Sequence, residues 1–474
     1  MVGRKTKIVC TIGPASNTPE MVEKLAKAGM NIIRFNFSHG DHESHGQQMD
    51  MVREVSDRIG VNLAVMLDTK GPEIRCGIFK NGYEEYSRGE IVTICREEIE
   101  GTHDRFHVQC PELFDDVVTG NYILIDDGKM KLTVLENTGR GELKCRNEVA
   151  GMIKNRKGCN VPSVRLSMPF ISKKDEADIR FGCEKDVDFL AASFVRRAED
   201  VLAIRKILVE MGKPAIQIIA KIENQEGFEN LEEILEVADG VMVARGDLGV
   251  EIQTQFVPIY QKQLIKAANR LGKPVITATH MLDSMTNNPR PTRAEASDVA
   301  NAVLDGSDAI MLSAESAAGE YPIEAVQMMA IIAEATEKII PYRENLELSK
   351  RSSKKTVQDA IGIAVSDATL TLENVAAVVA FTQGGTTARR ISKFRPAVPI
   401  LAVTFSKSTQ RKLEGFWGVT PIFSDVHNEM TNDDELASTI AKSYGIKPGE
   451  LIIITAGYPT GEGSANMMKL VEVK

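Results

Sequence analysis

The sequence predicts an α/β protein: a (β/α)8 TIM barrel with a small inserted β-barrel lid domain and a C-terminal three-layer α/β domain. Three observations predict this fold. Eight short apolar runs alternate with longer amphipathic stretches over residues 1–343, residues 71–168 interrupt them with β-rich runs, and residues 344–474 resume the alternation. Right-handed helical crossovers between parallel strands allow eight such units to close into a barrel.

The barrel strands are predicted from the apolar runs, and helical patterns such as those of residues 19–28 and 201–211 separate most of them. In barrels of this class the chemistry lies at the C-terminal ends of the strands. The predicted strands are 7–10, 31–34, 63–67, 188–192, 217–220, 240–244, 274–278 and 308–312.

The insert follows the third strand. Its β-rich runs are residues 91–94, 122–125 and 131–134, and turn signals such as Asn81-Gly82 and Asp127-Gly128 separate them. An insert at this point hangs over the C-terminal face of the barrel. We therefore expect a movable lid above the active site.

The C-terminal part begins after a polar, basic stretch, 349–355, which we interpret as a linker. Helical and strand runs then alternate at 357–372, 375–381, 386–394, 400–405, 435–444, 451–455 and 467–473. The expected domains are 1–70 with 169–343 for the barrel, 71–168 for the lid, and 344–474 for the C-terminal domain.

Composition excludes several classes of protein. The 474 residues are 43% hydrophobic with a net charge of −9, which argues against disorder and against general nucleic-acid binding. No apolar run approaches the roughly 18 residues of a membrane helix, so no membrane association is expected. The seven cysteines include no CxxC pair, which fits reduced thiols in a cytoplasmic protein.

Charged residues follow the strands of the predicted barrel. Lys221 and Glu223 are two apart, hence on one face if the strand persists, and Asp247 follows the next strand. With Arg34 after the second strand, these residues converge on one mouth. A cation beside two carboxylates suits an enzyme that handles a phosphoryl group or an enolate. The alternative is a set of solvated loop residues, because loops are generally polar.

Long motifs in this chain resemble those of the pyruvate kinases, and the resemblance runs from the first strand to the C-terminal residues. Within the family, the chain resembles those bacterial members that lack the extra C-terminal domain found in others. It implies transfer of the phosphoryl group of phosphoenolpyruvate to ADP, the final step of glycolysis, with Mg²⁺ and K⁺, in a homotetramer. The motifs are KIVCTIGP (7–14), NFSHG (36–40), LDTKGPEIR (67–75), KIENQEG (221–227), VARGDLGVE (243–251), TATHMLDSM (277–285) and NPRPTRAEASDVAN (288–301).

The resemblance assigns the catalytic centre. Glu223 and Asp247 match the Mg²⁺ ligands, and two carboxylates suit a cation that keeps water and substrate oxygens in its octahedron. Lys221 matches the lysine that neutralises the phosphoryl group in transfer. The alternative for Lys221 is a structural ion pair with Glu223, and both descriptions can hold in the empty site.

Three further positions match the substrate site, which also includes Lys221 and Asp247. Arg34 is expected to hold the substrate phosphate, because a guanidinium matches phosphate oxygens. Gly246 lets its backbone N–H approach the substrate carboxylate. Thr279 matches the hydroxyl near the methylene carbon of the enolate, and we assign it to proton transfer through water.

A monovalent-cation site is implied by four residues with hard oxygen ligands. Glu73 adds to this, because a glutamate there accompanies K⁺ dependence in the family and a lysine accompanies independence. We therefore expect activation by K⁺. The four residues are Asn36, Ser38, Asp68 and Thr69.

A nucleotide site is implied at the lid roots and after the second strand. The chain contains neither GxxxxGK[ST] nor GxGxxG, so nucleotide binding does not rest on those loops. Closure of the lid would bring Arg75 and Lys157 onto the phosphates. The matching residues are Asn36, Phe37, Ser38, His39, Arg75 and Lys157.

Three histidines, His39, His42 and His45, are spaced by three and suggest a zinc site. The spacing is not HExxH, and His39 belongs to the NFSHG motif. We favour solvated surface histidines.

A phosphorylated effector is expected in the C-terminal domain. Residues 382–387 join a strand to a helix, and N–H groups and hydroxyls at a helix start can hold a phosphate. In the family, sugar phosphates or AMP bind here, with help from the loop 457–464. The alternative is an ordinary turn with N-capping threonines. The expected ligands are Thr382, Gly384, Thr386 and Thr387.

The chain departs from the family pattern at three places and leaves two competing functions. His280 stands where many members have glutamine, and Ala314 and Ser163 replace common glycines. His280 could change the proton step, because histidine titrates near neutrality. The competing functions are a pyruvate aldolase or lyase, and an inactive metabolite sensor. The lid residues argue against the first, and the intact catalytic centre argues against the second.

Overall fold

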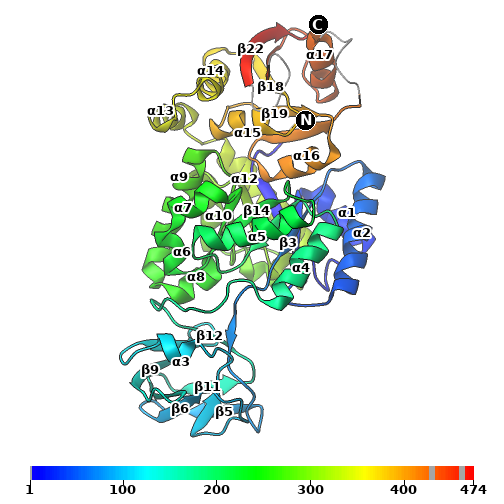
Figure 1. The fold of residues 1–474 in the computed structure, drawn as a ribbon. Helices are drawn as coiled ribbons and strands as arrows, with labels where there is room; N and C mark the ends of the chain where they lie inside the picture. The colour runs from blue at the N-terminus through cyan, green and yellow to red at the C-terminus, as the bar shows by residue number, and fades with distance from the viewer. Residues whose placement is uncertain (1–2, 426–432, 458–464) are drawn as a thin grey trace.

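The computed structural model describes residues 3–425, 433–457 and 465–474. Three bodies lie in a row (Figure 1): the barrel in the middle, the β-rich insert at one end, and the C-terminal α/β domain at the other. The predicted α/β class is confirmed, including the closed eight-stranded barrel and the separate α/β domain at the C-terminal end.

The barrel consists of eight parallel strands in the order β1-β17-β16-β15-β14-β13-β3-β2. Every predicted barrel strand is present, and its ends differ from the prediction by at most two residues. The strands are β1 (Lys7–Thr11), β2 (Ile32–Asn36), β3 (Ala64–Asp68), β13 (Phe189–Ala192), β14 (Gln217–Ile222), β15 (Gly240–Ala244), β16 (Val275–Ala278) and β17 (Ala309–Leu312).

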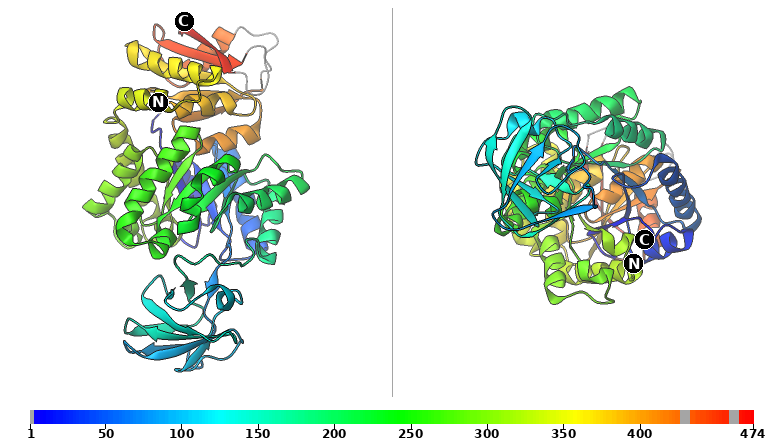
Figure 2. Two further views of the ribbon diagram at one scale, coloured as in Figure 1. Left: turned by 60° about the vertical axis from the view of Figure 1, so that its left-hand side comes forward. Right: turned by 90° about the horizontal axis from the view of Figure 1, so that it is seen from below.

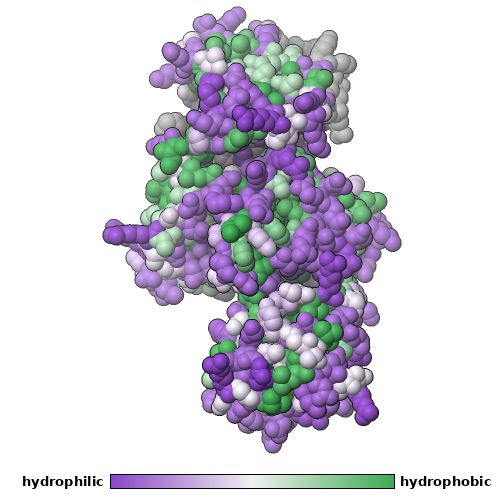
Figure 3. All heavy atoms as spheres, turned by 90° about the vertical axis from the view of Figure 1, so that its left-hand side faces the viewer, coloured by the Kyte–Doolittle hydropathy of each residue, from purple (hydrophilic) through white to green (hydrophobic). Residues whose placement is uncertain are grey.

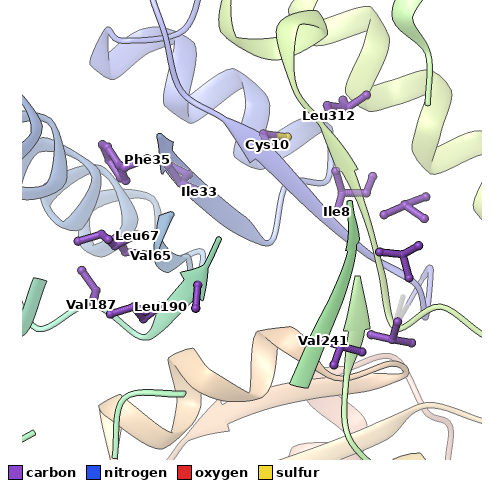
Figure 4. Close-up of a cluster of buried hydrophobic side chains, with 14 of the residues drawn as sticks. Ile8, Cys10, Ile33, Phe35, Val65, Leu67, Val187, Leu190, Val241 and Leu312 are labelled. Atoms are coloured by element: carbon purple, nitrogen blue, oxygen red, sulfur yellow. The ribbon is translucent and has the colours of Figure 1, made fainter. Parts of the chain in front are cut away.

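Alternate residues of each strand face opposite sides of the barrel wall. Val9 and Met66 belong to a cluster that fills the inside of the barrel. Their neighbours Ile8, Cys10 and Leu67 belong to the larger cluster between the wall and the helices, part of which Figure 4 shows. Both faces are therefore apolar, as is usual for a parallel sheet covered by helices.

Helices surround the barrel. Three of them begin with capping boxes, in which the side chain of Asp41, Ser172 or Thr292 accepts from the third backbone N–H. These elements are α1 (Pro19–Ala28), α2 (His42–Ile59), α4 (Lys173–Glu184), α5 (Ala198–Glu210), α6 (Gln225–Glu229), α7 (Leu231–Val237), α8 (Arg245–Glu251), η1 (Thr254–Phe256), α9 (Val257–Leu271), η2 (Asp283–Thr286), α10 (Arg293–Asp305), α11 (Ala314–Ala317) and α12 (Pro322–Glu337).

The insert follows β3, as predicted, and was expected as a small β-barrel. Its strands form a seven-stranded sheet in the order β4-β12-β8-β9-β10-β6-β7 and a two-stranded ribbon, β5 with β11, around a separate apolar core. The elements are β4 (Ile74–Arg75), β5 (Tyr83–Tyr86), β6 (Ile91–Cys95), β7 (Arg105–His107), α3 (Leu113–Asp116), β8 (Tyr122–Ile125), β9 (Met130–Asn137), β10 (Glu142–Asn147), β11 (Gly151–Lys154) and β12 (Gly158–Asn160). Seen from below, the lid lies over one side of the barrel (Figure 2).

The C-terminal domain is a five-stranded sheet in the order β20-β19-β18-β21-β22, with an apolar cluster on each face. The linker predicted at 349–355 is helical as far as Ser352, which corrects its beginning. The short strand β20 was not predicted. The elements are α13 (Tyr342–Ser352), α14 (Val357–Thr371), β18 (Val375–Phe381), α15 (Thr386–Lys393), β19 (Ile400–Thr404), α16 (Lys407–Lys412), η3 (Leu413–Gly415), β20 (Val419–Phe423), α17 (Asp433–Ser443), β21 (Leu451–Gly457) and β22 (Ala465–Glu472).

The C-terminal domain is joined to the barrel at the N-terminal ends of the strands. Lys7 Nζ lies 3.3 Å from Glu414, and Arg395 lies 3.1 Å from Asp308. This contact leaves the other end of the barrel to the lid. We propose domain boundaries near residues 71, 169 and 344, where the chain passes from one of these sheets to the next.

Candidate active site

The predicted centre lies where strands of the barrel end beneath the lid. Arg34 is on β2, Asp68 is the last residue of β3, and Lys221 is on β14. Glu223 follows β14 directly, and Asp247 is in the first turn of α8, which begins where β15 ends. The barrel therefore brings together side chains that are far apart in the sequence.

Lys221 is the central cation. Its Nζ donates to Ser193 Oγ at 2.6 Å and to Asp68 Oδ1 at 3.1 Å, and it lies 3.0 Å from Glu223 Oε1. Burial alone would lower the pKa of Lys221, but Asp68 and Glu223 outweigh burial and raise the pKa above its usual value. Lys221 is therefore a fixed ammonium group at physiological pH.

Arg34 shares Asp68 with Lys221. Its Nε donates to Asp68 Oδ2 at 2.6 Å, and its Nη1 donates to Thr11 Oγ1 at 2.9 Å. Burial would raise the pKa of Asp68, but Arg34 and Lys221 hold it below the usual value. One ionised, buried carboxylate thus orients both cations of the mouth.

Glu223 and Asp247 form the pair of carboxylates. Glu223 Oε2 accepts the backbone N–H of Phe194 at 2.6 Å, and its buried Oε1 lies 3.0 Å from the ammonium of Lys221. Burial raises the pKa of Glu223 to about 7 against the opposing effect of Lys221, and Asp247 adds to the rise. Loss of solvent in the mouth also raises the pKa of Asp247, although Lys221 opposes it. Two neighbouring carboxylates that share one ammonium group fit a divalent cation that binds few protein ligands.

Thr279 and Gly246 lie against each other. A Cβ atom on Gly246 would come within 2.8 Å of Thr279 Cγ2, so only glycine fits there. Thr279 has a φ of 75°, which is strained for a β-branched residue. Arg245, the residue before Gly246, donates to the carbonyls of Ala278 and Thr279 and holds this loop in place.

The four residues assigned to K⁺ lie at the ends of β2 and β3. Asn36 is paired with Asp68 across the two strands, and the Asn36 side chain accepts the N–H of Ser38 at 3.1 Å. Thr69 Oγ1 accepts the N–H of Ser193 at 3.1 Å. These oxygens therefore belong to the same region as Lys221, because Ser193 also contacts Lys221.

A cavity of about 560 Å³ separates the lid from the barrel mouth, and Arg75 and Lys157 line it from the lid side. Lys157 Nζ lies 2.7 Å from Asp126, and Arg75 donates to Glu73 at 2.9 and 2.7 Å. Asp247 lines the opposite side of the cavity. Lid cations and barrel carboxylate thus face one space.

The segment 36–39 lies beside the start of α2. Phe37 is buried and stacks on His45 at 4.3 Å between ring centroids, whereas His39 is exposed. Among the residues lining the cavity that the structure describes, none comes from this segment. A contribution of Phe37 to nucleotide binding is therefore limited to its backbone.

The three spaced histidines have other partners. His42 Nε2 lies 2.7 Å from Asp178, and His45 Nε2 lies 2.7 Å from the carbonyl of His39. His42 and His45 are half-buried rather than fully solvated. No cluster of three metal-ligating side chains occurs among the described residues, so the zinc alternative has no support there.

The expected effector site is the turn between β18 and α15. Thr382 and Thr387 are buried, Gly384 is exposed, and Thr386 accepts from Arg389 at 3.3 Å. The N-cap of α15 is Gly385, and no side chain of the described residues caps this helix, so the alternative of N-capping threonines is wrong. Residues 458–464 of the expected second loop lie outside the described residues.

The departures from the family pattern differ in their surroundings. His280 is exposed with a φ of 54°, and Ser163 at the lid root has a φ of 65°. Both are left-handed conformations that glycine adopts at lower cost. Ala314 begins α11 with an ordinary helical backbone, so no glycine is needed there.

Three contributions to the site were not predicted, and a fourth, that of Ser193, was expected only as a polar strand end that faces the mouth. Ser193 links Lys221, Asp68 and Thr69, and the N–H of Phe194 holds Glu223. Asp126 and Glu251 line the cavity. The polar Ser193 at the end of β13 was a usable signal, but a backbone N–H and a carboxylate inside an α-helix carry none.

Comparisons with known proteins decide the family. A model of the pyruvate kinase barrel domain matches residues 3–326, and a model of the pyruvate kinase alpha/beta domain matches residues 359–471. The chain belongs to the pyruvate kinase family. It is 52% identical over 472 residues to pyruvate kinases of Staphylococcus haemolyticus and Staphylococcus epidermidis. It is also 52% identical over 473 residues to that of Staphylococcus aureus; 98% of the chain and 80% of each relative are covered.

Membership of this family makes the chain a phosphotransferase of the pyruvate kinase type, as the motifs implied. Among the described residues, no helix has the length and apolar character needed to cross a bilayer.

Proposed function

We propose that the chain transfers the phosphoryl group of phosphoenolpyruvate to ADP, with Mg²⁺ and K⁺ as cofactors. The observation that carries this is the contact of Lys221 with Asp68, Ser193 and Glu223 at the mouth, beneath a cavity lined by Arg75 and Lys157. Lys221 is a fixed cation that lies between the two carboxylates and the two cations of the lid. This arrangement suits the transfer of a phosphoryl group between two phosphate-bearing substrates.

Arg34 binds the substrate phosphate, and Lys221 contacts the phosphoryl group during its transfer. Both ammonium and guanidinium groups exchange part of their pairing with Asp68 for phosphate oxygens, which they bind with similar geometry. Gly246 offers its N–H to the substrate carboxylate. Thr279 orients a water molecule that delivers a proton to the enolate methylene carbon.

Mg²⁺ would be held by Glu223 and Asp247, and when bound it neutralises the charge on the transferring phosphoryl oxygens. The two carboxylates, whose negative charge is opposed by the single ammonium of Lys221, support this assignment. K⁺ would be held by oxygens of Asn36, Ser38, Asp68 and Thr69.

The nucleotide would occupy the cavity between lid and barrel. Its phosphates displace Asp126 from Lys157 and Glu73 from Arg75, because they carry more charge than either carboxylate. A water-excluding lid then protects the phosphoryl group from hydrolysis.

The proposal also covers an effector site in the C-terminal domain and the assembly of the chain. A sugar phosphate or AMP would bind at Thr382, Gly384, Thr386 and Thr387, where the uncapped start of α15 leaves N–H groups available. We further propose a cytoplasmic homotetramer, as the resemblance implies.

The decisive experiment measures pyruvate release from phosphoenolpyruvate with ADP present or omitted, each with and without Mg²⁺ and K⁺. Turnover is expected only with ADP and Mg²⁺, and K⁺ is expected to increase it. Turnover without ADP would identify a lyase, and a complete lack of turnover would identify an inactive metabolite sensor.

Activation by K⁺ is predicted to depend on Glu73. Near-full activity in K⁺-free, ammonium-free buffer would contradict the role of Glu73. In Glu73→Lys the new ammonium supplies the missing charge, so activity without K⁺ should rise toward the activity with K⁺. Glu85→Lys, the same change at an exposed lid position, is the control and should keep the K⁺ dependence.

A further inference from the structure

One side-chain hydrogen bond among the described residues joins the sheet of the lid to the barrel. Asn160 Nδ2, at the end of β12, donates to Glu251 Oε1, at the end of α8, over 2.9 Å. Among the residues that the structure describes, no other side-chain hydrogen bond joins strands β4 to β12 to the barrel. The outline of the molecule narrows between lid and barrel (Figure 3), and further contacts come from the lid root, where Arg196 donates to the carbonyls of Leu166 and Met168.

On the barrel side, the bond ends on the helix that carries a proposed metal ligand. Asp247 and Glu251 are four residues apart on α8, which places them on the same face of the helix. Both side chains line the cavity. A force on Glu251 therefore acts on the short helix that also holds Asp247.

On the lid side, the bond ends on the strand pair that carries the nucleotide cations. Lys157 immediately precedes β12, and β12 pairs with β4, with Gly158 opposite Arg75. The N–H of Cys76 also donates to the carbonyl of Lys157 at 2.9 Å. The pairing of β12 with β4 thus fixes the positions of Arg75 and Lys157 relative to Asn160.

We propose that the Asn160–Glu251 hydrogen bond is a catch that positions the nucleotide-binding strands of the lid over α8. The inference rests on the proposed function, because it assigns the two residues a positioning role for ADP. Neither residue touches the reacting atoms. With the catch intact, the separation between the lid cations and Asp247 is set before the nucleotide arrives, so less ordering free energy is lost on binding.

The two residues allow the hydrogen bond to be broken and then rebuilt in reverse. Burial raises the pKa of Glu251 to about 7, so the test is made above pH 8, where Asn160→Asp places two ionised carboxylates against each other and opens the catch. Glu251→Gln keeps an acceptor oxygen for Asn160. In Asn160→Asp with Glu251→Gln, the glutamine donates to the aspartate, so the bond returns with donor and acceptor exchanged. Glu236→Gln, an exposed glutamate on α7, is the matched control.

The kinetic test separates positioning from general damage. We expect Asn160→Asp to raise KM for ADP about tenfold, the effect of losing roughly 1.4 kcal/mol. KM for phosphoenolpyruvate should change less than twofold. Glu236→Gln should stay near wild type, and the double variant should recover most of the loss. Equal effects on both substrates, or no recovery in the double variant, would overturn the proposal.

A second measurement follows the lid directly. Spin labels at Arg140→Cys in the lid and Lys266→Cys on α9 report the separation of the two bodies, and the seven native cysteines are buried. The distance distribution should be narrow in wild type, broad in Asn160→Asp and narrow again in the double variant. Identical distributions would refute the catch. If wild type makes no pyruvate, the proposed function fails, while the label distances still decide whether the catch exists.

Discussion

Each cation of the site is already paired with a carboxylate. Lys221 and Arg34 contact Asp68, Arg75 contacts Glu73, and Lys157 contacts Asp126. Carboxylates bind these groups with the same geometry that phosphate oxygens use, so the empty site holds the cations in nearly their working positions. When a substrate binds, its phosphate replaces the carboxylate as the partner of each cation.

The role of Lys221 predicts a large loss on its removal. Lys221→Met should lower kcat by about a hundredfold to a thousandfold, the usual cost of one donor that stabilises transition-state charge. Lys206→Met, on the exposed face of α5, is the control and should leave kcat unchanged. The measurement is steady-state pyruvate formation, and a loss of less than tenfold for Lys221→Met would contradict the role of this lysine.

The raised pKa of Glu223 predicts how Mg²⁺ activation depends on pH. In the metal-free protein the pKa of Glu223 is about 7, so below pH 7 a proton must leave before the carboxylate can bind the metal. The Mg²⁺ concentration for half-activation should rise up to about tenfold per pH unit below 7 and level off above it. The same shift means that the metal-free fold loses stability as the pH rises through 7, because ionised Glu223 is disfavoured there.

Glu223→Gln is the matching variant. It cannot ionise, so Mg²⁺ activation should be weak at every pH and the rise below pH 7 should disappear. Titrations of activity against Mg²⁺ from pH 6 to pH 8.5 provide the measurement. A pH-independent Mg²⁺ requirement in wild type would refute the assignment.

Among the elements, α8 shows how a short helix can serve two purposes. It has seven residues, and its first turn carries Gly246 and Asp247 while its last residue contacts the lid. A helix of this length has little stability of its own, so its position depends on packing against β15, β16 and α9. The site therefore depends on neighbouring elements more than on helix propensity.

Helices α14 and α15 are joined by a buried ion cluster. Asp359 on α14 is fully buried and lies 2.9 Å from Lys393 and 3.3 Å from Arg390 on α15. Burial opposes ionisation of Asp359, but its hydrogen bonds and both cations hold the pKa below the usual value. Its contribution to stability is thus present at neutral pH and is lost as the pH falls toward that lowered pKa.

Removal of this acid should destabilise the C-terminal domain. Asp359→Ala leaves buried Lys393 unpaired and should cost about 3–5 kcal/mol. Thermal unfolding should show a lower midpoint for the C-terminal domain, whereas Asp359→Ala with Lys393→Ala should recover part of it. Glu373→Ala, at an exposed position after α14, is the control. An unchanged midpoint for Asp359→Ala would show that the cluster contributes no net stability.

For the whole molecule, the barrel is held from both ends. Its C-terminal mouth faces the lid, and its N-terminal rim is fixed to the C-terminal domain by ion pairs such as Arg411 with Asp188 at 2.7 Å. The only tryptophan, Trp417, is buried at this second contact, where its backbone N–H donates to Asp308 Oδ1 at 3.1 Å. Its fluorescence therefore reports on the junction of the two domains.

Asp308 should be essential to that junction. It also accepts from Arg395 and from the N–H of Val275, so Asp308→Ala leaves two backbone donors, those of Val275 and Trp417, without a partner and removes the ion pair of Arg395. The red shift of Trp417 emission should occur at lower urea concentration in this variant. Asp57→Ala, an exposed residue on α2, should behave like wild type. Coincident transitions for all three proteins would contradict this role.

Much of the architecture follows from local sequence. The barrel strands are continuous apolar runs, and this pattern survives in the fold because both faces of each strand are buried. The strand β20 escaped prediction because Pro421 interrupts its pattern, and an edge strand tolerates proline. The linker was placed too early because its polar residues are equally compatible with the exposed helix α13.

The catalytic residue types and their order along the chain were readable from the sequence, because Lys221, Glu223 and Asp247 occur in long motifs at strand ends. Contacts between distant segments were not readable. The sharing of Asp68 by two cations, the outward direction of Arg245 and the bond from Asn160 to Glu251 depend on how the strands and the lid are placed in space. Local patterns specify which chemical groups are present; closure of the barrel specifies which of them touch.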